Sequence, residues 1–269
     1  MKRIHLVEIE DLHWFPDSLR QCMTRLIIVM HKLLGSQHEL TRLISRSLNH
    51  ADRPAIIDLC SGSGGPMVEV FKRLKTQPRL QNLTLTLTDL YPHQETADQI
   101  NSKGGSGINY LTKSVNAGDL DVEQVGVRTM VCSMHHMKPE VAHNILSDAK
   151  AKRQPICLFE LSDNSFPIRL WWMAIPMIFL LAFFITPLVK PMTWRQLVFT
   201  YLVPIIPICF AWDGAVSNAR TYTLADMDEL LKGLQTSDYV WEKGKVGGML
   251  KKLYLLGLPM ASPRQWPGE

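Results

Sequence analysis

The chain has 269 residues, of which 46% are hydrophobic and 20% are charged. This composition excludes a disordered chain, and the length suffices for one or two domains with buried cores. The net charge of +4 is not gathered into a cluster of Lys and Arg, so we expect no nucleic-acid partner. The five cysteines contain no C-x-x-C pair, which excludes a zinc ribbon and a disulfide scaffold and indicates a reducing compartment.

Two amphipathic helices are predicted near the N-terminus. Residues 17–34 place apolar side chains on one stripe, and Gly35 ends the pattern. Ser36 and Glu39 then form a capping box that begins the second helix. We therefore expect residues 1–54 to form an N-terminal helical cap.

Short apolar strands alternate with helices beyond this cap. The predicted strands are 55–60, 83–88, 108–115, 128–134, 156–161, 239–246 and 251–258, and helices are expected at 66–75, at 93–103, from Pro139 and from Thr223. This alternation predicts an α/β fold with a mostly parallel sheet covered on both faces. No helix separates the last two strands, so one strand is expected to be antiparallel. Ligands of such sheets bind at the carboxyl ends of the strands.

A glycine-rich turn joins the first strand to the next helix. It reads Asp58-Leu59-Cys60-Ser61-Gly62-Ser63-Gly64. Gly62 and Gly64 fit the G-x-G-x-x-G dinucleotide fingerprint, but Met67 stands at the third glycine position. Asp58 also disfavours a pyrophosphate. An acid beside a glycine turn suits S-adenosylmethionine (SAM), which carries a cationic sulfonium and an ammonium group.

The turn resembles motif I of the class I SAM-dependent methyltransferases, in which an acid precedes glycines at every second position. Cys60 stands where that pattern has its first glycine. Asp89 ends the second strand, 25 residues after Gly64, where the family binds the ribose hydroxyls. The resemblance implies a Rossmann-like, doubly wound fold and SAM as the cofactor. It implies a cofactor site made of Asp58, Cys60, Ser61, Gly62, Gly64, Asp89, Leu90, Asn116, Ala117 and Ser133.

A pair of histidines follows the fourth predicted strand. The segment Ser133-Met134-His135-His136-Met137 resembles the post-strand segment of many small-molecule and lipid methyltransferases. A general base is needed only if the acceptor's nucleophile carries a proton. The candidate bases are His135, His136 and Glu160, and a purely structural role for either histidine is the alternative. Neighbouring residues of an extended strand point to opposite sides, so we expect no metal site there.

The most apolar part of the chain lies between the fifth and sixth strands. Leu170–Val189 runs 20 residues without a charge, and Leu197–Trp212 runs another 16. A 20-residue helix is long enough to cross a bilayer, but both runs contain prolines, which break or kink helices. Residues 166–212 are therefore expected to form a hydrophobic helical hairpin. Three alternatives are open: a re-entrant or interfacial membrane hairpin, a two-span hairpin, or a soluble lid or dimer interface.

Polar residues border this hairpin and are candidates for binding the acceptor. Asp213 and Arg220 follow it at once, and an ion pair between them is the alternative to a headgroup site. Trp14 and Phe15 resemble the N-terminal cap that many family members fold over the cofactor. With Tyr222 they complete the predicted substrate-binding set.

These patterns predict a methyltransferase core at residues 55–165 and 213–269. The expected activity is SAM-dependent methyl transfer to a hydrophobic or lipid-like acceptor at the cytoplasmic face of a membrane. One alternative is a soluble small-molecule methyltransferase with an apolar lid. Another is a catalytically silent SAM-binding protein that recruits partners to a membrane.

Overall fold

The computed structural model describes residues 1, 3–62, 64–102, 107–120, 124–162, 164, 167–248 and 251–260. The chain divides into two compact units. The first, here called the helical unit, consists of Met1–Gly35 and Ser162–Thr223. The second, the sheet unit, consists of Ser36–Leu161 and Leu224–Glu269.

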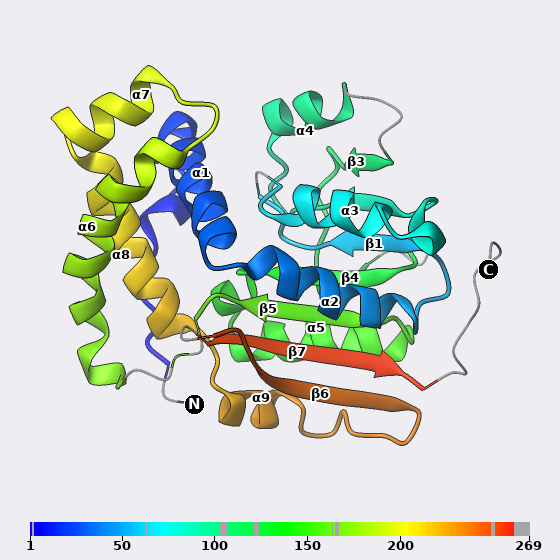
Figure 1. The fold of residues 1–269 in the computed structure, drawn as a ribbon. Helices are drawn as coiled ribbons and strands as arrows, with labels where there is room; N and C mark the ends of the chain where they lie inside the picture. The colour runs from blue at the N-terminus through cyan, green and yellow to red at the C-terminus, as the bar shows by residue number, and fades with distance from the viewer. Residues whose placement is uncertain are drawn as a thin grey trace. The chain divides into compact units, whose positions relative to one another are not determined.

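The sheet unit is built on seven strands in the order β3-β2-β1-β4-β5-β7-β6 (Figure 1). β1 to β5 are parallel to their neighbours, whereas β7 runs antiparallel to both β5 and β6. The strands are β1 (Ala55–Asp58), β2 (Thr84–Leu87), β3 (Ile108–Tyr110), β4 (Val127–Val131), β5 (Ile156–Glu160), β6 (Tyr239–Val246) and β7 (Lys252–Pro259). The predicted mostly parallel sheet with one antiparallel strand is confirmed.

Helices cover both faces of this sheet, because its central strands are apolar on both sides. α2 and α3 lie in front of the sheet in Figure 1, and α5 lies behind it. The bounds are α2 (Ser36–Leu48), α3 (Met67–Lys75), α4 (Gln94–Asn101), α5 (Pro139–Ala151) and α9 (Leu224–Leu230), with 3₁₀ turns η2 (Pro78–Leu80) and η3 (Met134–His136).

The second N-terminal helix belongs to the sheet unit, which differs from the expected boundary after residue 54. Its apolar stripe, including Leu40 and Ile44, is buried in one cluster with Ile56 of β1 and Val127 of β4. Gly35 has φ +67°, a conformation that ends α1 before α2 begins. The compact units therefore part at Gly35.

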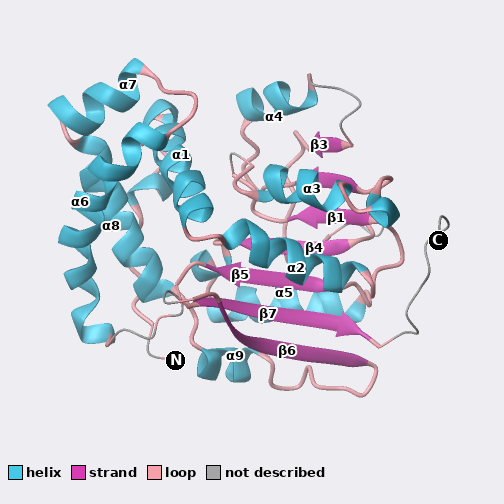
Figure 2. Ribbon diagram, in the orientation of Figure 1, coloured by secondary structure: helices cyan, strands magenta, loops and turns pink. Residues whose placement is uncertain are grey.

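The helical unit packs an apolar hairpin against the first helix (Figure 2). Its helices are η1 (Ile9–Asp11), α1 (Asp17–Leu33), η4 (Ile168–Met173), α6 (Ala174–Ile185), η5 (Thr186–Leu188), α7 (Trp194–Leu197), the π-helical η6 (Val198–Leu202) and α8 (Ile205–Arg220). Met23 and Leu26 of α1 are buried in one cluster with Ala182 and Ile185 of α6 and Phe210 of α8. This shared cluster holds the hairpin and α1 together.

The prolines Pro176, Pro204 and Pro207 of the hairpin lie at helix starts and at a bend, where they break no helical hydrogen bond. Pro176 and Pro207 lie in the first turns of α6 and α8, where a missing N–H costs no helical hydrogen bond. Pro204 lies at the break between η6 and α8, where the chain bends by 81°. α8 continues to Arg220, so residues 213–220 belong to the hairpin. The predicted core boundary at residue 213 is therefore eight residues too early.

Within the described residues, Ile168–Leu188 is the one helix long and apolar enough to cross a membrane. A second candidate exists only if the bent pair Trp194–Leu202 and Ile205–Arg220 is counted as one span.

Candidate functional site

The glycine turn after β1 adopts the backbone conformation that its sequence pattern demands. Cys60, Gly62 and Gly64 have φ values of +56°, +51° and +87°. A side chain disfavours this left-handed region, so Cys60 is strained where glycine would not be. A Cβ added to Gly62 would meet nothing within 4 Å, so the left-handed conformation and not close packing is what favours glycine there.

Asp58 braces this turn from inside the sheet unit. Its carboxylate accepts hydrogen bonds from the hydroxyls of Ser61 at 2.7 Å and Thr129 at 2.6 Å. Burial raises the pKa of Asp58 to about 7, and the charge of Asp89 adds to the rise, although both hydroxyls oppose it. The predicted acid is therefore in place, but its oxygens are engaged by the protein itself.

Asp89 joins the end of β2 to the same turn. One carboxylate oxygen accepts the N–H of Gly62 at 2.9 Å, and the other accepts the N–H of Tyr91 at 2.9 Å. The backbone carbonyl of Asp89 also accepts the N–H of Val115 at 2.8 Å. These bonds connect the segments that follow the carboxyl ends of the parallel strands β1, β2 and β3.

The remaining predicted cofactor residues lie in the segments that follow β2, β3 and β4. Asn116 accepts the N–H of Gly118 at 2.9 Å through its side-chain oxygen, which forms a tight Asx turn, and Ala117 is buried next to it. Leu90 is exposed. Ser133, after β4, is buried, and its hydroxyl has no hydrogen-bond partner among the described residues.

Tyr110 is a contact of the turn that the sequence pattern did not reveal. Its hydroxyl donates to the carbonyl of Gly62 at 2.7 Å. Burial raises the pKa of this phenol to about 12, so Tyr110 stays protonated and able to donate. Thr129 was missed in the same way, because each reads as an ordinary strand residue.

His135 and Glu160 form a buried pair at the ends of β4 and β5. Nδ1 of His135 lies 2.8 Å from Oε2 of Glu160, and the backbone N–H of His135 donates to Oε1 at 3.1 Å. An ionised carboxylate only accepts hydrogen bonds, so Nδ1–H of His135 is the donor to Glu160. Glu160 thus fixes the orientation and the tautomer of His135.

The two histidines do not point to opposite sides, as an extended strand would require. β4 ends at Val131, Cys132 has φ +53°, and His135 and His136 lie in the 3₁₀ turn η3. Their ring centroids are 4.2 Å apart. The prediction that His135 and His136 cannot share a metal assumed an extended strand, and this assumption is wrong.

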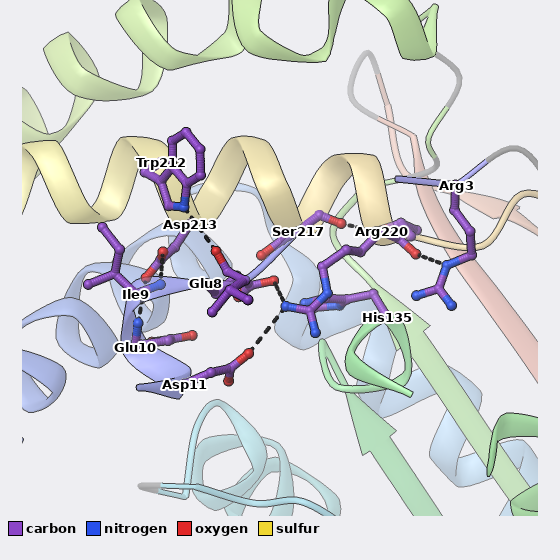
Figure 3. A network of polar contacts seen from close by, with 12 residues as sticks. Arg3, Glu8, Ile9, Glu10, Asp11, His135, Trp212, Asp213, Ser217 and Arg220 are labelled. Carbon is purple, nitrogen blue, oxygen red and sulfur yellow. Dashed lines mark hydrogen bonds and ion pairs between the residues drawn. The ribbon is translucent and has the colours of Figure 1, made fainter. Parts of the chain in front are cut away.

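The predicted substrate residues lie in the helical unit, where Asp213 and Arg220 bind the N-terminal segment (Figure 3). Asp213 accepts the N–H groups of Ile9 at 2.6 Å and Glu10 at 3.1 Å. Arg220 binds Glu8 at 2.9 Å and Asp11 at 3.2 Å. The alternative of an Asp213–Arg220 ion pair is not what these contacts show.

Three further residues of that set have separate environments. The hydroxyl of Tyr222 accepts a hydrogen bond from Arg3 at 2.7 Å, and the guanidinium lies 3.9 Å from the ring centre. Phe15 is buried in the apolar cluster of the helical unit, whereas Trp14 is exposed. Phe15 therefore serves packing, and Trp14 is accessible.

No protein-family model matches the sequence, and no curated protein matches it. Among solved structures, the chain is similar to the plantazolicin methyltransferase BamL in complex with a triazolic desmethylPZN analog and SAH, with 10% identity, a TM-score of 0.49 and coverage of 91% of this chain and 99% of that chain. The plantazolicin methyltransferase BpumL in complex with SAH gives 10% identity, a TM-score of 0.47 and coverage of 90% and 98%. LepI in complex with SAM gives 10% identity and a TM-score of 0.47, and the match covers 81% of this chain but 46% of LepI.

The strand order of the sheet unit, its antiparallel β7 and the glycine turn after β1 agree with the Rossmann-like fold that the resemblance to the class I methyltransferases implies.

Proposed function

We propose that this protein is a SAM-dependent methyltransferase whose acceptor is a hydrophobic or lipid-like molecule with a protonated nucleophile, taken from a membrane face. The observation that carries the proposal is the buried His135–Glu160 pair at the carboxyl end of β4 and β5. The glycine turn lies at the carboxyl end of β1, next to β4 in the sheet. The proposed cofactor site at the glycine turn and the proposed base His135 thus both lie at the carboxyl ends of neighbouring strands.

The chemistry of the sheet edge fits SAM. Asp58 and Asp89 place two acids at the glycine turn, which favours a cationic ligand over a pyrophosphate. Asp89 supplies oxygens that accept from ribose hydroxyls once its bond to Gly62 is exchanged. The hydroxyl of Ser133 is buried and has no hydrogen-bond partner within the described part of the chain, and a ligand at the carboxyl end of β4 would satisfy it.

When bound, SAM supplies the electrophilic methyl group, and the protein's own task is to orient and deprotonate the acceptor. Because Glu160 holds the proton on Nδ1 of His135, Nε2 is the basic nitrogen that takes the acceptor's proton. A hydroxyl acceptor needs this step, whereas a thioether or neutral amine does not. The pair therefore favours oxygen as the methylated atom.

The apolar hairpin supports an acceptor of low polarity. Residues 167–212 contain no acidic residue, and several large apolar side chains of this segment are exposed. An exposed apolar surface of this kind is typical of a contact with a membrane or with another protein. We propose that it places the protein at the cytoplasmic face of a membrane.

Calorimetric titration of SAM, with and without lipid vesicles, tests the cofactor assignment, and methyl transfer from labelled SAM into membrane-lipid extracts tests the acceptor. We expect micromolar SAM binding in both conditions and label in the lipid fraction. Binding without label in lipid, but with label in soluble metabolites, would favour a soluble enzyme with an apolar lid. Binding without any turnover would leave a silent SAM-binding protein.

A further inference from the structure

One face of the hairpin's longest helix is apolar and uncovered. Met173, Met177, Leu180, Phe184 and Leu188 are all exposed. Their spacing of three or four residues places them on one side of Ile168–Leu188. The opposite side, with Ala182 and Ile185, is buried in the cluster of the helical unit. The helix thus has one packed face and one exposed face, and both are apolar.

The ends of this stripe carry the side chains that bilayer surfaces select. Trp172 is exposed at one end, and Trp194 is exposed just beyond the other. Arg169 precedes the stripe, Lys190 and Arg195 follow it, and all three are exposed. With no acid between residues 167 and 212, the segment is complementary to an anionic lipid surface. A bilayer is therefore the occupant that we assign to the stripe.

The connections of the hairpin exclude a single crossing. β5 precedes it, and β7, which follows it, pairs with β5 in the same sheet. Both ends must therefore stay on one side of a membrane, so the number of crossings is zero or two.

For a second crossing, the described residues offer only the bent pair Trp194–Leu202 and Ile205–Arg220. The bent pair turns by 81° at its break. Asp213 and Arg220 hold the last part of α8 to the charged residues Glu8 and Asp11 and to the backbone of Ile9. This leaves Ile205–Trp212 for the apolar phase, a length of about 12 Å, where a bilayer core needs about 30 Å.

Together these observations lead us to infer that the hairpin inserts into one leaflet and does not cross the bilayer. Ile168–Leu188 lies in the plane of the membrane with its free stripe toward the acyl chains. An upright helix would sink Lys190 and Arg195 at its far end, whereas an in-plane helix keeps both ends among the headgroups. This inference rests on the membrane association in the proposed function and names its partner surface, an anionic lipid leaflet.

Flotation with phosphatidylcholine vesicles, with and without phosphatidylserine, tests the surface. We expect binding that phosphatidylserine strengthens. Leu180→Asp and Phe184→Asp should each weaken vesicle affinity about tenfold, because each replaces an exposed apolar side chain of the proposed membrane contact with a charge. Val141→Asp is the matched control, since Val141 is exposed on α5 of the sheet unit, and its affinity should not change. Unchanged thermal unfolding of all three variants shows that their fold is intact.

Labelling of a Met192→Cys variant tests the topology, because Met192 is exposed in the connection after the stripe. The protein is added outside sealed vesicles, and an impermeant maleimide is supplied either outside or trapped inside. We expect labelling from outside alone, above the background of the parent protein. Labelling from inside would show a crossing and overturn the inference. Absence of vesicle binding, or a dimer that Leu180→Asp dissociates, would overturn the lipid assignment. SAM binding, measured on the same variants, reports separately on the proposed function.

Discussion

Oε2 of Glu160 lies 2.8 Å from Nδ1 of His135, and both side chains are buried. The neighbouring Oε1 accepts the backbone N–H of the same histidine at 3.1 Å. One carboxylate therefore fixes both the ring and the backbone of the turn after β4. In the proposed reaction, Nε2 is the nitrogen of His135 that takes the acceptor's proton.

Replacing Glu160 with Gln should reduce methyl transfer by about one hundredfold, because the amide no longer selects the Nδ1–H tautomer. His135→Ala should cost as much or more. KM for SAM should stay unchanged in both variants, since neither side chain belongs to the glycine turn. The measurement is kcat as a function of pH. The increase of kcat with pH that reports a catalytic base should disappear in His135→Ala.

His136→Phe is the control for this pair, because it keeps a ring next to His135 without a basic nitrogen. We expect at least half of the activity to remain. A loss equal to that of His135→Ala would move the base to His136 and contradict the assignment.

Asp89→Ala should weaken SAM binding by about ten- to one hundredfold, the range for a lost hydrogen bond to a charged group. The fold should persist, because the carboxylate lies at the half-exposed end of β2 and bonds to a turn. Calorimetry gives the affinity, and thermal unfolding gives the stability. Asp119→Ala, which removes an exposed acid of the same unit, should bind SAM like the parent. Equal affinity in both variants would remove Asp89 from the site.

The pKa of Asp58, raised to about 7 mainly by burial, predicts a pH-dependent affinity. A cationic ligand at the turn favours the ionised acid, so binding releases a proton from Asp58 below about pH 7. SAM affinity should therefore fall up to about tenfold as the pH drops by one unit below that value. Calorimetry in buffers of different ionisation enthalpy measures the proton directly.

Asp58→Asn should remove this proton release and flatten the pH dependence of SAM affinity.

The raised pKa of Asp58 also affects the stability of the fold, and this effect has the opposite dependence on pH. Because the folded state holds the proton more tightly than an unfolded Asp with a pKa near 3.8, Asp58 stabilises the fold at low pH relative to high pH. That contribution is lost as the pH rises through about 7, and Asp58→Asn should abolish the loss.

Cys60→Gly should stabilise the protein by about 0.5–1 kcal/mol, since φ +56° strains any side chain at this position. Cys60→Ala keeps the strain and removes the thiol, so it isolates the backbone effect. Burial and the nearby Asp89 and Asp58 raise the pKa of the Cys60 thiol to about 12, so the thiol is not a nucleophile at neutral pH. Chemical denaturation compares the three proteins, and a less stable Gly variant would contradict the strain argument.

The sheet could be predicted from the sequence because its signals are local. Apolar strands alternate with amphipathic helices, and the last two strands flank Gly247, so the order of elements followed from pattern alone. The glycine turn was equally readable, because left-handed positions leave a sequence signature. Cys60 shows the limit of that signature, since a non-glycine residue adopts the same conformation.

Contacts between distant segments could not be predicted in the same way. Tyr110 reaches the carbonyl of Gly62 through a hydroxyl whose residue reads as an ordinary strand position. Asp213 and Arg220 looked like a pair because they are close in sequence, yet each binds the N-terminal segment more than two hundred residues away. The turn η3 was missed because an apolar strand pattern does not show where Cys132 leaves the extended conformation.

Arg220→Met should destabilise the helical unit by about 3–5 kcal/mol, because it leaves the buried carboxylate of Glu8 without its guanidinium partner. Glu8→Gln alone should cost less, since the amide is neutral and still accepts a hydrogen bond. If the pair acts as a unit, Glu8→Leu combined with Arg220→Met should recover most of the loss, as replacement of both charges by apolar groups removes the desolvation cost. Urea denaturation of the parent, Glu8→Leu, Arg220→Met and the double variant closes this double-mutant cycle. Additive losses in the double variant would show that Glu8 and Arg220 contribute independently, and the N-terminal segment would then be held mainly by Asp213.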